Sequence, residues 1–161
     1  MSTSPTPAAL ITGLFETHLN VANLERSIEF YEQVLGLQLG IQQEARRVAM
    51  VWIGGWGKAM LGLWEKPESE IIRQHLAFEV QLADLDRTIG LVKRLGVQLR
   101  NFFEERTDVP TVFGWIPAAS IYFDDPDGHA LEFLAKLPGD PRPEIGVVSW
   151  DDWQRLTRPS T

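Results

Sequence analysis

The chain has 161 residues, of which 44% are hydrophobic, and its formal net charge is −7 at pH 7. This length and apolar content suffice for one substantial core, so we expect one domain, with two small repeated units as the alternative. The acidic balance and the lack of a basic run argue against nucleic acid or an anionic membrane as a partner. No apolar stretch approaches the length that spans a bilayer.

The beginning of the chain and its cysteine usage bear on location. Residues 1–13 lack the basic region and the long apolar run of a signal peptide, so we interpret them as a short flexible leader. The sequence contains no cysteine, which excludes a disulfide scaffold, a thiolate metal site and a cysteine nucleophile. We therefore predict a cytoplasmic protein.

Residues 14–66 predict one strand, one helix and three further strands. Gly13–Val21 alternates between polar and apolar residues, as a strand does. Asn23 suits the N-cap of an amphipathic helix over Leu24–Leu35, and Gly36 suits its end. The other expected strands are 37–43, 46–53 and 58–66.

The same order returns in residues 75–137, after a polar linker at 67–74. A strand at 75–80 and an amphipathic helix at 82–95 are followed by expected strands at 97–103, 119–124 and 129–136, with a long loop at 104–117. Asp125-Pro126-Asp127-Gly128 supplies a preset φ at its proline and a permissive φ at its glycine, so it predicts the tight turn before the last strand.

The two halves align with one another. THLNV at 17–21 matches QHLAF at 74–78, and LGLWEK at 61–66 matches LEFLAK at 131–136, which indicates duplication followed by loop insertion. We predict an α+β fold in which two βαβββ modules form a curled mixed sheet, with flanking helices, around a cleft. Residues 138–161 form a C-terminal extension with a short helix over 150–156, capped by Ser149.

Two histidines and one carboxylate form the candidate site. His18 and His75 open the first strands of the two halves, and the repeat makes them equivalent. Glu132 lies in an apolar strand, where a carboxylate is costly to bury without a cation or donors. A 2-His-1-carboxylate set leaves positions open for substrate and suits divalent iron, manganese, nickel or zinc. Because the position equivalent to Glu132 in the first half is Gly62, we predict three protein ligands and not four.

Each candidate also has a plainer interpretation. A histidine at a strand start is often an edge residue, and a glutamate in a half-buried sheet often faces solvent. His129 falls on the opposite face from Glu132 by parity and is expected to belong to the turn. Tyr122 is our candidate for a hydroxyl near the metal, and its alternative is a surface hydroxyl. Glu79 shares a face with His75 and is a candidate general base or partner of that ligand, with a solvated charge as the alternative.

These residues and motifs resemble the vicinal oxygen chelate superfamily, which includes glyoxalase I, fosfomycin-modifying thiol transferases, extradiol dioxygenases and bleomycin-resistance proteins. The resemblance covers roughly residues 14–137, through THLNV, FYEQVLGLQL, QHLAFEV and YFDDPDGHALEF. It implies two βαβββ modules around a cleft and one divalent metal (Fe, Mn, Ni, Co or Zn) bound by His18, His75 and Glu132. It also implies a homodimer, in which many members exchange modules between subunits.

Departures from the subfamilies narrow the chemistry. Glyoxalase I has a fourth ligand where this chain has Gly62, and the acid/base histidine of extradiol dioxygenases is missing from residues 113–115, so both activities are disfavoured. The fosfomycin transferases share Tyr122, but Asn20 stands where they have a threonine. Their full basic cluster is not identified, and the candidates for it are Arg100, Arg106 and Arg142.

We predict a metalloenzyme that uses its metal as a Lewis acid on a small oxygen-chelating substrate, with lyase, isomerase, thiol-transferase and dioxygenase reactions open. The alternatives are a metal-free small-molecule binding protein of the bleomycin-resistance type, and a ligand-responsive module. The residues that share strand faces near the site are Met50, Trp52, Met60 and Trp64. If they line the cleft, they favour a hydrophobic or aromatic oxygenated substrate over a small phosphonate; the alternative is plain core.

Overall fold

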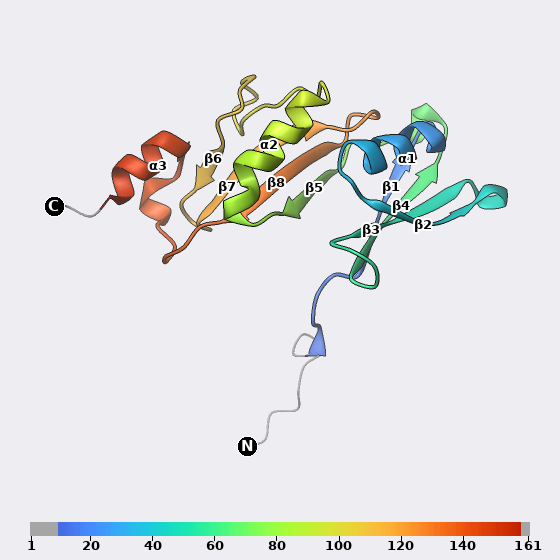
Figure 1. Cartoon of the computed structure of the whole chain (residues 1–161), viewed down its shortest axis with the longest axis horizontal. Helices are drawn as coiled ribbons and strands as arrows, with labels where there is room; N and C mark the ends of the chain where they lie inside the picture. The colour runs from blue at the N-terminus through green and yellow to red at the C-terminus, as the bar shows by residue number, and fades with distance from the viewer. Residues whose placement is uncertain (1–9, 159–161) are drawn as a thin grey trace, which may run out of the picture. The chain divides into compact units, whose positions relative to one another are not determined.

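The computed structural model describes residues 10–158 and divides the chain into two units, one up to Ile71 and one from Ile72 onward. Each unit builds a mixed β-sheet with a helix against it (Figure 1). The predicted α+β class with two βαβββ modules is confirmed. Most of the predicted leader, residues 1–9, lies outside the described residues. No helix within residues 10–158 is long and apolar enough to cross a membrane.

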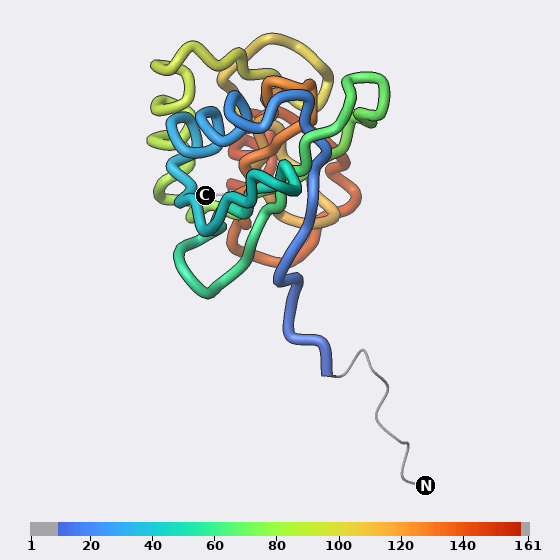
Figure 2. The backbone as a smooth tube through the Cα atoms, turned by 90° about the vertical axis from the view of Figure 1, so that its right-hand side faces the viewer, coloured from blue at the N-terminus to red at the C-terminus, as the bar shows by residue number. Residues whose placement is uncertain are grey.

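The first unit has a four-stranded sheet in the order β1-β4-β3-β2. Strand β1 is parallel to β4, whereas the other neighbours are antiparallel. The tube in Figure 2 follows the chain from residue 10 through β1 into α1. Its elements are β1 (Glu16–Val21), α1 (Leu24–Gln33), β2 (Gln38–Gln43), β3 (Val48–Ile53) and β4 (Ala59–Glu65), with short 3₁₀ turns at Glu44–Arg46 and Glu68–Glu70.

Helix α1 begins where its sequence predicts. The Asn23 side chain accepts the backbone N–H of Arg26 at 2.8 Å, which satisfies one of the donors that a helix start leaves free. Leu24, Ile28 and Tyr31 are buried on its inner side, and α1 contacts β2, β3 and β4. The sheet residues in the core of this unit alternate along the strands and include Leu19, Val21, Ala49, Val51, Leu61 and Leu63.

The second unit has a five-stranded sheet in the order β5-β8-β7-β6-β9, with β5 parallel to β8. Helix α2 buries Leu85, Ile89 and Val92. The elements of this unit are β5 (His75–Glu79), a 3₁₀ turn (Leu82–Asp84), α2 (Leu85–Arg94), β6 (Thr111–Phe113), β7 (Ala118–Asp124), β8 (Ala130–Lys136), a 3₁₀ turn (Pro143–Ile145), β9 (Val147–Ser149) and α3 (Trp150–Thr157).

One strand of the second half is misplaced by the sequence pattern. Residues 97–103 form no strand; Arg100 makes only isolated bridges to Tyr122 and Arg106. Strand β6 instead lies at 111–113, within the predicted loop, and pairs with β7 at Ala118–Ser120. The reason is the turn at Asn101, whose side-chain oxygen accepts the N–H groups of Phe103 and Glu105 and so ends the extended run.

The C-terminal extension adds to the second sheet. Strand β9 pairs with β6, an addition that the sequence pattern does not predict. Helix α3 follows at once, and the Ser149 hydroxyl accepts the N–H of Asp152 at 3.2 Å, as the capping prediction requires. Trp153 is buried on its inner side.

Candidate metal and substrate site

His75 and Glu132 face each other in the second unit. The Nε2 atom of His75 lies 3.0 Å from Oε2 of Glu132. The carboxylate side chain is only 5% exposed, whereas the imidazole is half exposed. His75 Nδ1 lies 3.1 Å from the carbonyl oxygen of Ala130 and donates to it. The other ring nitrogen, Nε2, is therefore the one that faces Glu132 and could bind a metal. A backbone carbonyl on the far nitrogen is the support that metal-binding histidines usually have.

The separation of these two atoms fits a shared metal ion. Two ligands that each lie about 2.1 Å from one ion are about 3 Å apart. A divalent cation held between them would also supply a countercharge to the buried carboxylate. The second unit therefore brings two of the three predicted ligands together.

His129 supports this arrangement from the other side of the sheet. It is completely buried, and its Nδ1 accepts the backbone N–H of Gln74 at 3.1 Å, next to His75. The backbone N–H of His129 donates to Oδ1 of Asp125, which also accepts the backbone N–H of Asp127. Gly128 adopts a φ of 82°, as this turn requires. His129 thus belongs to the turn, as its parity predicts, and fixes the start of β5.

Tyr122 lies opposite Glu132 in the antiparallel pair of β7 and β8. Burial raises the pKa of its hydroxyl, and the negative charge of Glu132, to which the hydroxyl donates a hydrogen bond, raises the pKa further. The hydroxyl is therefore held protonated beside the candidate ligand. The tyrosine ring also lies against His75, with ring centroids 6.0 Å apart.

His18, in the first unit, has both ring nitrogens engaged. The indole Nε1–H of Trp64 donates to His18 Nδ1 at 2.7 Å, and His18 Nε2 lies 2.7 Å from Glu16 Oε1. Because an indole only donates, Nδ1 must be the acceptor, so Nε2 carries the proton and donates to the carboxylate. In this arrangement His18 has no free lone pair for a metal, whereas Glu16 does.

Strand register changes the equivalence that the sequence predicts. In the first unit Met60 lies opposite Glu16 and Gly62 opposite His18, whereas in the second Ala130 lies opposite His75 and Glu132 opposite Ala77. If Gly62 corresponds to Glu132, His75 corresponds to Glu16, two residues before His18. The predicted equivalences of His18 with His75 and of Gly62 with Glu132 therefore cannot both hold; if the second is kept, the first is wrong because the shared His-Leu pair misaligns the two strands. Glu16 and His18 are two residues apart on β1, so both side chains lie on the same face of this strand.

Gly62 makes room for the His18 ring. A Cβ atom at Gly62 would lie 2.2 Å from His18 Nδ1, which no side chain tolerates without displacing the imidazole. The position that could hold a fourth ligand is instead covered by a histidine from the neighbouring strand. Both His18 and Gly62 are singled out from the sequence, but the sequence does not predict that they touch.

Glu79 lies at the exposed end of β5. Its carboxylate pairs with Lys136 Nζ at 3.0 Å, and both side chains are more than half exposed. The structure thus places Glu79 on the same strand as His75 with a partner of its own. Within either unit alone, the described residues form no group of three or more histidine and carboxylate side chains suited to a metal.

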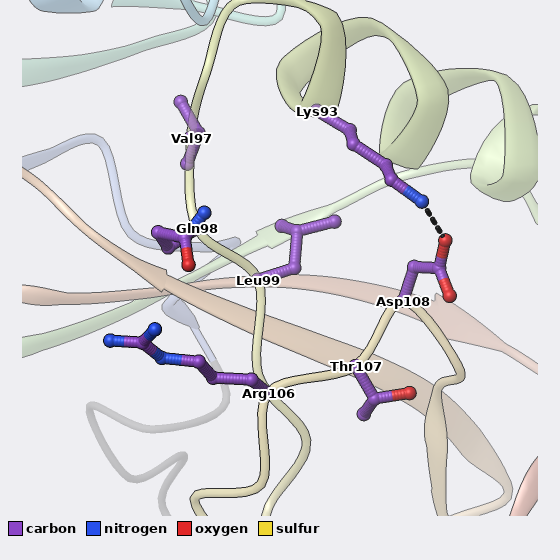
Figure 3. A pocket seen from close by; sticks show the side chains of 7 residues that line it. All are labelled: Lys93, Val97, Gln98, Leu99, Arg106, Thr107 and Asp108. Carbon is purple, nitrogen blue, oxygen red and sulfur yellow. Dashed lines mark hydrogen bonds and ion pairs between the residues drawn. The ribbon is translucent and has the colours of Figure 1, made fainter.

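A pocket of about 360 Å³ adjoins His75 in the second unit. It is lined by Arg73, His75, Arg100, Phe102, Glu104, Tyr122 and Ala130. Of these, Arg73 and Glu104 escape the sequence reasoning because they lie in segments without strand or helix periodicity. A smaller pocket of about 230 Å³ lies between α2 and the loop that follows it, where Lys93 points to Asp108 (Figure 3). Arg106, a candidate for the basic cluster, lines this second pocket, but none of the candidate metal ligands does, so it is not the candidate metal site.

Comparisons with known proteins give the family that the chain resembles. Residues 13–133 match the profile of the Glyoxalase/Bleomycin resistance protein/Dioxygenase superfamily. The chain is 25% identical over 137 residues to a lactoylglutathione lyase of Neisseria meningitidis, covering 79% of this chain and 93% of the relative. It is 32% identical over 126 residues to a metallothiol transferase FosB of Staphylococcus haemolyticus, covering 76% and 83%. An integron cassette protein from the Halifax Harbour sewage outfall, 35% identical, covers 78% of this chain and 99% of its own, with a TM-score of 0.66.

Proposed function

Because the chain belongs to the Glyoxalase/Bleomycin resistance protein/Dioxygenase superfamily, we propose that it is a metalloenzyme acting on a small oxygen-chelating substrate. In this proposal His75 and Glu132 are the ligands that the second unit supplies. The observation that carries it is the 3.0 Å approach of His75 Nε2 to Glu132 Oε2, with the other ring nitrogen tied to a carbonyl. A divalent ion held there would act as a Lewis acid on substrate oxygens.

Tyr122 is the proposed catalytic hydroxyl. Its hydroxyl lies beside Glu132 and donates to it, so in this proposal the hydroxyl turns from the carboxylate to donate a hydrogen bond to a substrate oxygen once Glu132 binds the metal. Glu79 stays a prediction as a base; its ion pair with Lys136 would have to open before it could accept a proton from a substrate.

The third ligand stays a prediction, and the first unit offers two candidates for it. His18 is the residue predicted from the sequence. It can bind a metal only if its Nε2 loses the proton that it donates to Glu16, or if its Nδ1 loses the hydrogen bond from Trp64. Glu16 is the residue that strand register makes equivalent to His75, and its carboxylate is a ligand for the same metals. Variants at the two positions separate these possibilities.

A metal-free binding protein of the bleomycin-resistance type is the second candidate. The observation that favours it is that the His18, Glu16 and Trp64 side chains satisfy one another within the first unit. Such a protein would need no third ligand and would use the pocket beside His75 for binding alone.

Elemental analysis of protein purified without added metal or chelator tests the proposal. We expect about one divalent ion per chain, and its loss in His75→Ala, because the site keeps too few ligands. His18→Gln and Glu16→Gln are compared with Glu29→Gln, an exposed carboxylate change on α1. The variant of this pair that loses metal identifies the third ligand. The opposite result is a parent chain that contains no metal and takes up no iron, manganese, nickel, cobalt or zinc on reconstitution. That result would contradict the proposed metalloenzyme and favour the metal-free binding protein.

The predicted homodimer and the cytoplasmic location stay predictions. The chain's relatives include enzymes whose names state activities on small molecules, which supports a small-molecule substrate here. Light scattering on the purified chain measures the oligomeric state directly.

A further inference from the structure

Arg100 is a buried cation that its neighbours do not fully use. Its side chain is only 11% exposed, and its Nη2 donates to Asp124 Oδ1 at 2.9 Å. Its Nε atom is buried and donates an aligned hydrogen bond to none of the described residues. Glu104 Oε2 lies 2.8 Å from that Nε, close enough for an ion pair but off the line of the N–H bond. A buried donor left in this state marks a place that a better acceptor can occupy.

Arg73 strengthens the positive charge at the same place. It lies two residues before His75, and its guanidinium donates to the same Asp124 Oδ1 at 3.0 Å. One carboxylate oxygen thus serves two guanidinium groups. Both arginines line the pocket of about 360 Å³ that adjoins His75.

Glu104 holds its place over Arg100 through a strained turn. Its φ is 62°, in the left-handed region that favours glycine, although it is a glutamate. Asn101 imposes this conformation, because its side-chain oxygen accepts the N–H groups of Phe103 and Glu105 while its carbonyl accepts the N–H of Glu104. Strain of this kind is retained where the surroundings fix it, often at ligand sites.

Aromatic rings form the rest of the pocket wall. Phe102 lies 6.5 Å from the Tyr122 ring and 5.2 Å, edge to face, from Phe113. Phe102 is 46% exposed, so a further ring can pack against it. The pocket therefore joins a planar apolar wall to a cationic end, beside the two candidate ligands.

We propose that Arg100 and Arg73 bind the carboxylate of an aromatic carboxylic acid, and that Glu104 occupies this place until the acid enters. The ring of the acid packs against Phe102 and Tyr122, and a second oxygen on the ring reaches toward His75 and Glu132. That last contact rests on the proposed metal function, whereas the arginine contacts do not. Asp124 and Glu104 match the two guanidinium charges in number, so displacing Glu104 leaves one positive charge, which suits a monoanion better than a phosphonate dianion.

The test is isothermal titration calorimetry on the full chain, treated with a chelator, with three probes. These are 2-hydroxybenzoate, its neutral analogue 2-hydroxybenzyl alcohol, and phenylphosphonate. We expect 2-hydroxybenzoate to bind at least about tenfold more tightly than the alcohol, because charge-assisted bonds to guanidinium are the strong ones. Equal affinities for 2-hydroxybenzoate and the alcohol, or tighter binding of phenylphosphonate, would overturn the proposed ligand class. A failure of all three probes to bind would overturn it too.

Variants place the binding in this pocket. Arg100→Gln and the exposed Arg73→Gln should each weaken 2-hydroxybenzoate about tenfold, whereas Arg94→Gln, an exposed change on α2, should leave it unchanged. Arg73→Gln keeps the test open if Arg100→Gln does not fold. Glu104→Gln should tighten binding severalfold by removing the competing charge. Unchanged affinity in both Arg73→Gln and Arg100→Gln would contradict the proposal.

The outcome is separable from that of the metal proposal. If the chain takes up no metal but binds 2-hydroxybenzoate through its arginines, the present inference holds and the metalloenzyme proposal is wrong. A metal-loaded chain whose probe binding ignores both arginines would do the reverse.

Discussion

The two units repeat one topology but hold their polar groups in opposite ways. In the second unit Glu132 is buried, His75 is oriented by a backbone carbonyl, and Arg100 keeps an unused buried donor. In the first unit His18 is 42% exposed and is satisfied by Glu16 on one nitrogen and Trp64 on the other. The second unit thus leaves a histidine, a carboxylate and a guanidinium beside one pocket, whereas the polar side chains of the first unit bind one another.

The difference follows from single positions on equivalent strands. Strand β8 carries Glu132 where β4 carries Gly62, and the space left by that glycine is filled by His18. A glycine in one copy and a carboxylate in the other thus give the two corresponding strands different groups at one position. The residues of β3 and β4 that share the face of Gly62 include Met50, Trp52, Met60 and Trp64.

The largest effect should come from corresponding positions in the separate cores of the two units. Leu61 and Leu131 occupy corresponding places on β4 and β8, and both are completely buried. Each change to alanine should lower the free energy of unfolding by about 3 kcal/mol, because a cavity is left where a methyl-rich side chain packs. Urea unfolding followed by circular dichroism measures both.

The matched pair also tests whether the halves are equally well packed. Leu156→Ala, an exposed change on α3, is the control and should cost little. A loss below about 1 kcal/mol in only one of the two buried variants would show that the core of that unit is looser than its burial implies.

The next effect concerns the turn that supports the site of the second unit. Asp125 is buried, and its Oδ1 accepts the N–H groups of Asp127 and His129. Asp125→Ala should lower the free energy of unfolding by about 2 kcal/mol, since one buried and one partly buried backbone N–H group lose their acceptor. It should also loosen His129 and the start of β5, which hydrogen exchange of the Gln74 amide would detect.

Asp125→Asn separates shape from charge in this turn. The amide keeps an acceptor oxygen in the same place, so it should recover about half of the loss. Slow exchange of the Gln74 amide in Asp125→Ala would contradict the link from this turn to His75.

A smaller effect should follow from filling the glycine of the first unit. Gly62→Ala brings a Cβ atom within 2.2 Å of His18 Nδ1, so the half-exposed ring must rotate away and release Trp64. We expect a loss of about 1 kcal/mol, and an upfield shift of the Trp64 indole N–H in the ¹H–¹⁵N spectrum as its hydrogen bond is lost. Gly90→Ala in α2 is the control and should stabilise by about 0.5–1 kcal/mol, because alanine favours a helix over glycine. An unshifted Trp64 signal would show that the His18 contact is not what Gly62 serves.

Much of this fold is predictable because its strands and helices have clear periods and caps. Asn23, Gly36 and the Asp125–Gly128 turn each determine a boundary through local chemistry, and the structure has them where expected. Parity gives the residues that share a face within one strand, and the strand pairing then puts Tyr122 and Glu132 on the same face as His75. Residues 97–103 fail because their apolar character predicts a strand, whereas the Asn101 turn, a local hydrogen-bond pattern, ends it.

The rest of the candidate site depends on register and on loops. A shared His-Leu pair makes His18 look like the counterpart of His75, but hydrogen bonds between strands select Glu16, and sequence similarity does not report those bonds. Arg73 and Glu104 lie in irregular segments, so no period predicts which way their side chains point. Arg100 is named among the candidate basic residues, but its burial and unused donor depend on tertiary packing.

The smallest effect should be a pH dependence that belongs to the first unit. Arg47 donates to both oxygens of Glu65, at 2.9 and 2.6 Å, and the N–H of Leu24 at the start of α1 donates to the same carboxylate. These bonds, the arginine's first, lower the pKa of Glu65 from about 4.5 to about 2. A folded pKa below the unfolded one stabilises above pH 4.5, and this contribution is lost as the pH falls toward 2. Glu65→Gln should therefore unfold at lower urea than the parent at pH 6, with a gap that narrows at pH 3. The gap is expected to be small because the pair is partly exposed. In an Arg47→Gln background the same change should show little narrowing, and a gap independent of pH in the parent background would contradict the role of this carboxylate.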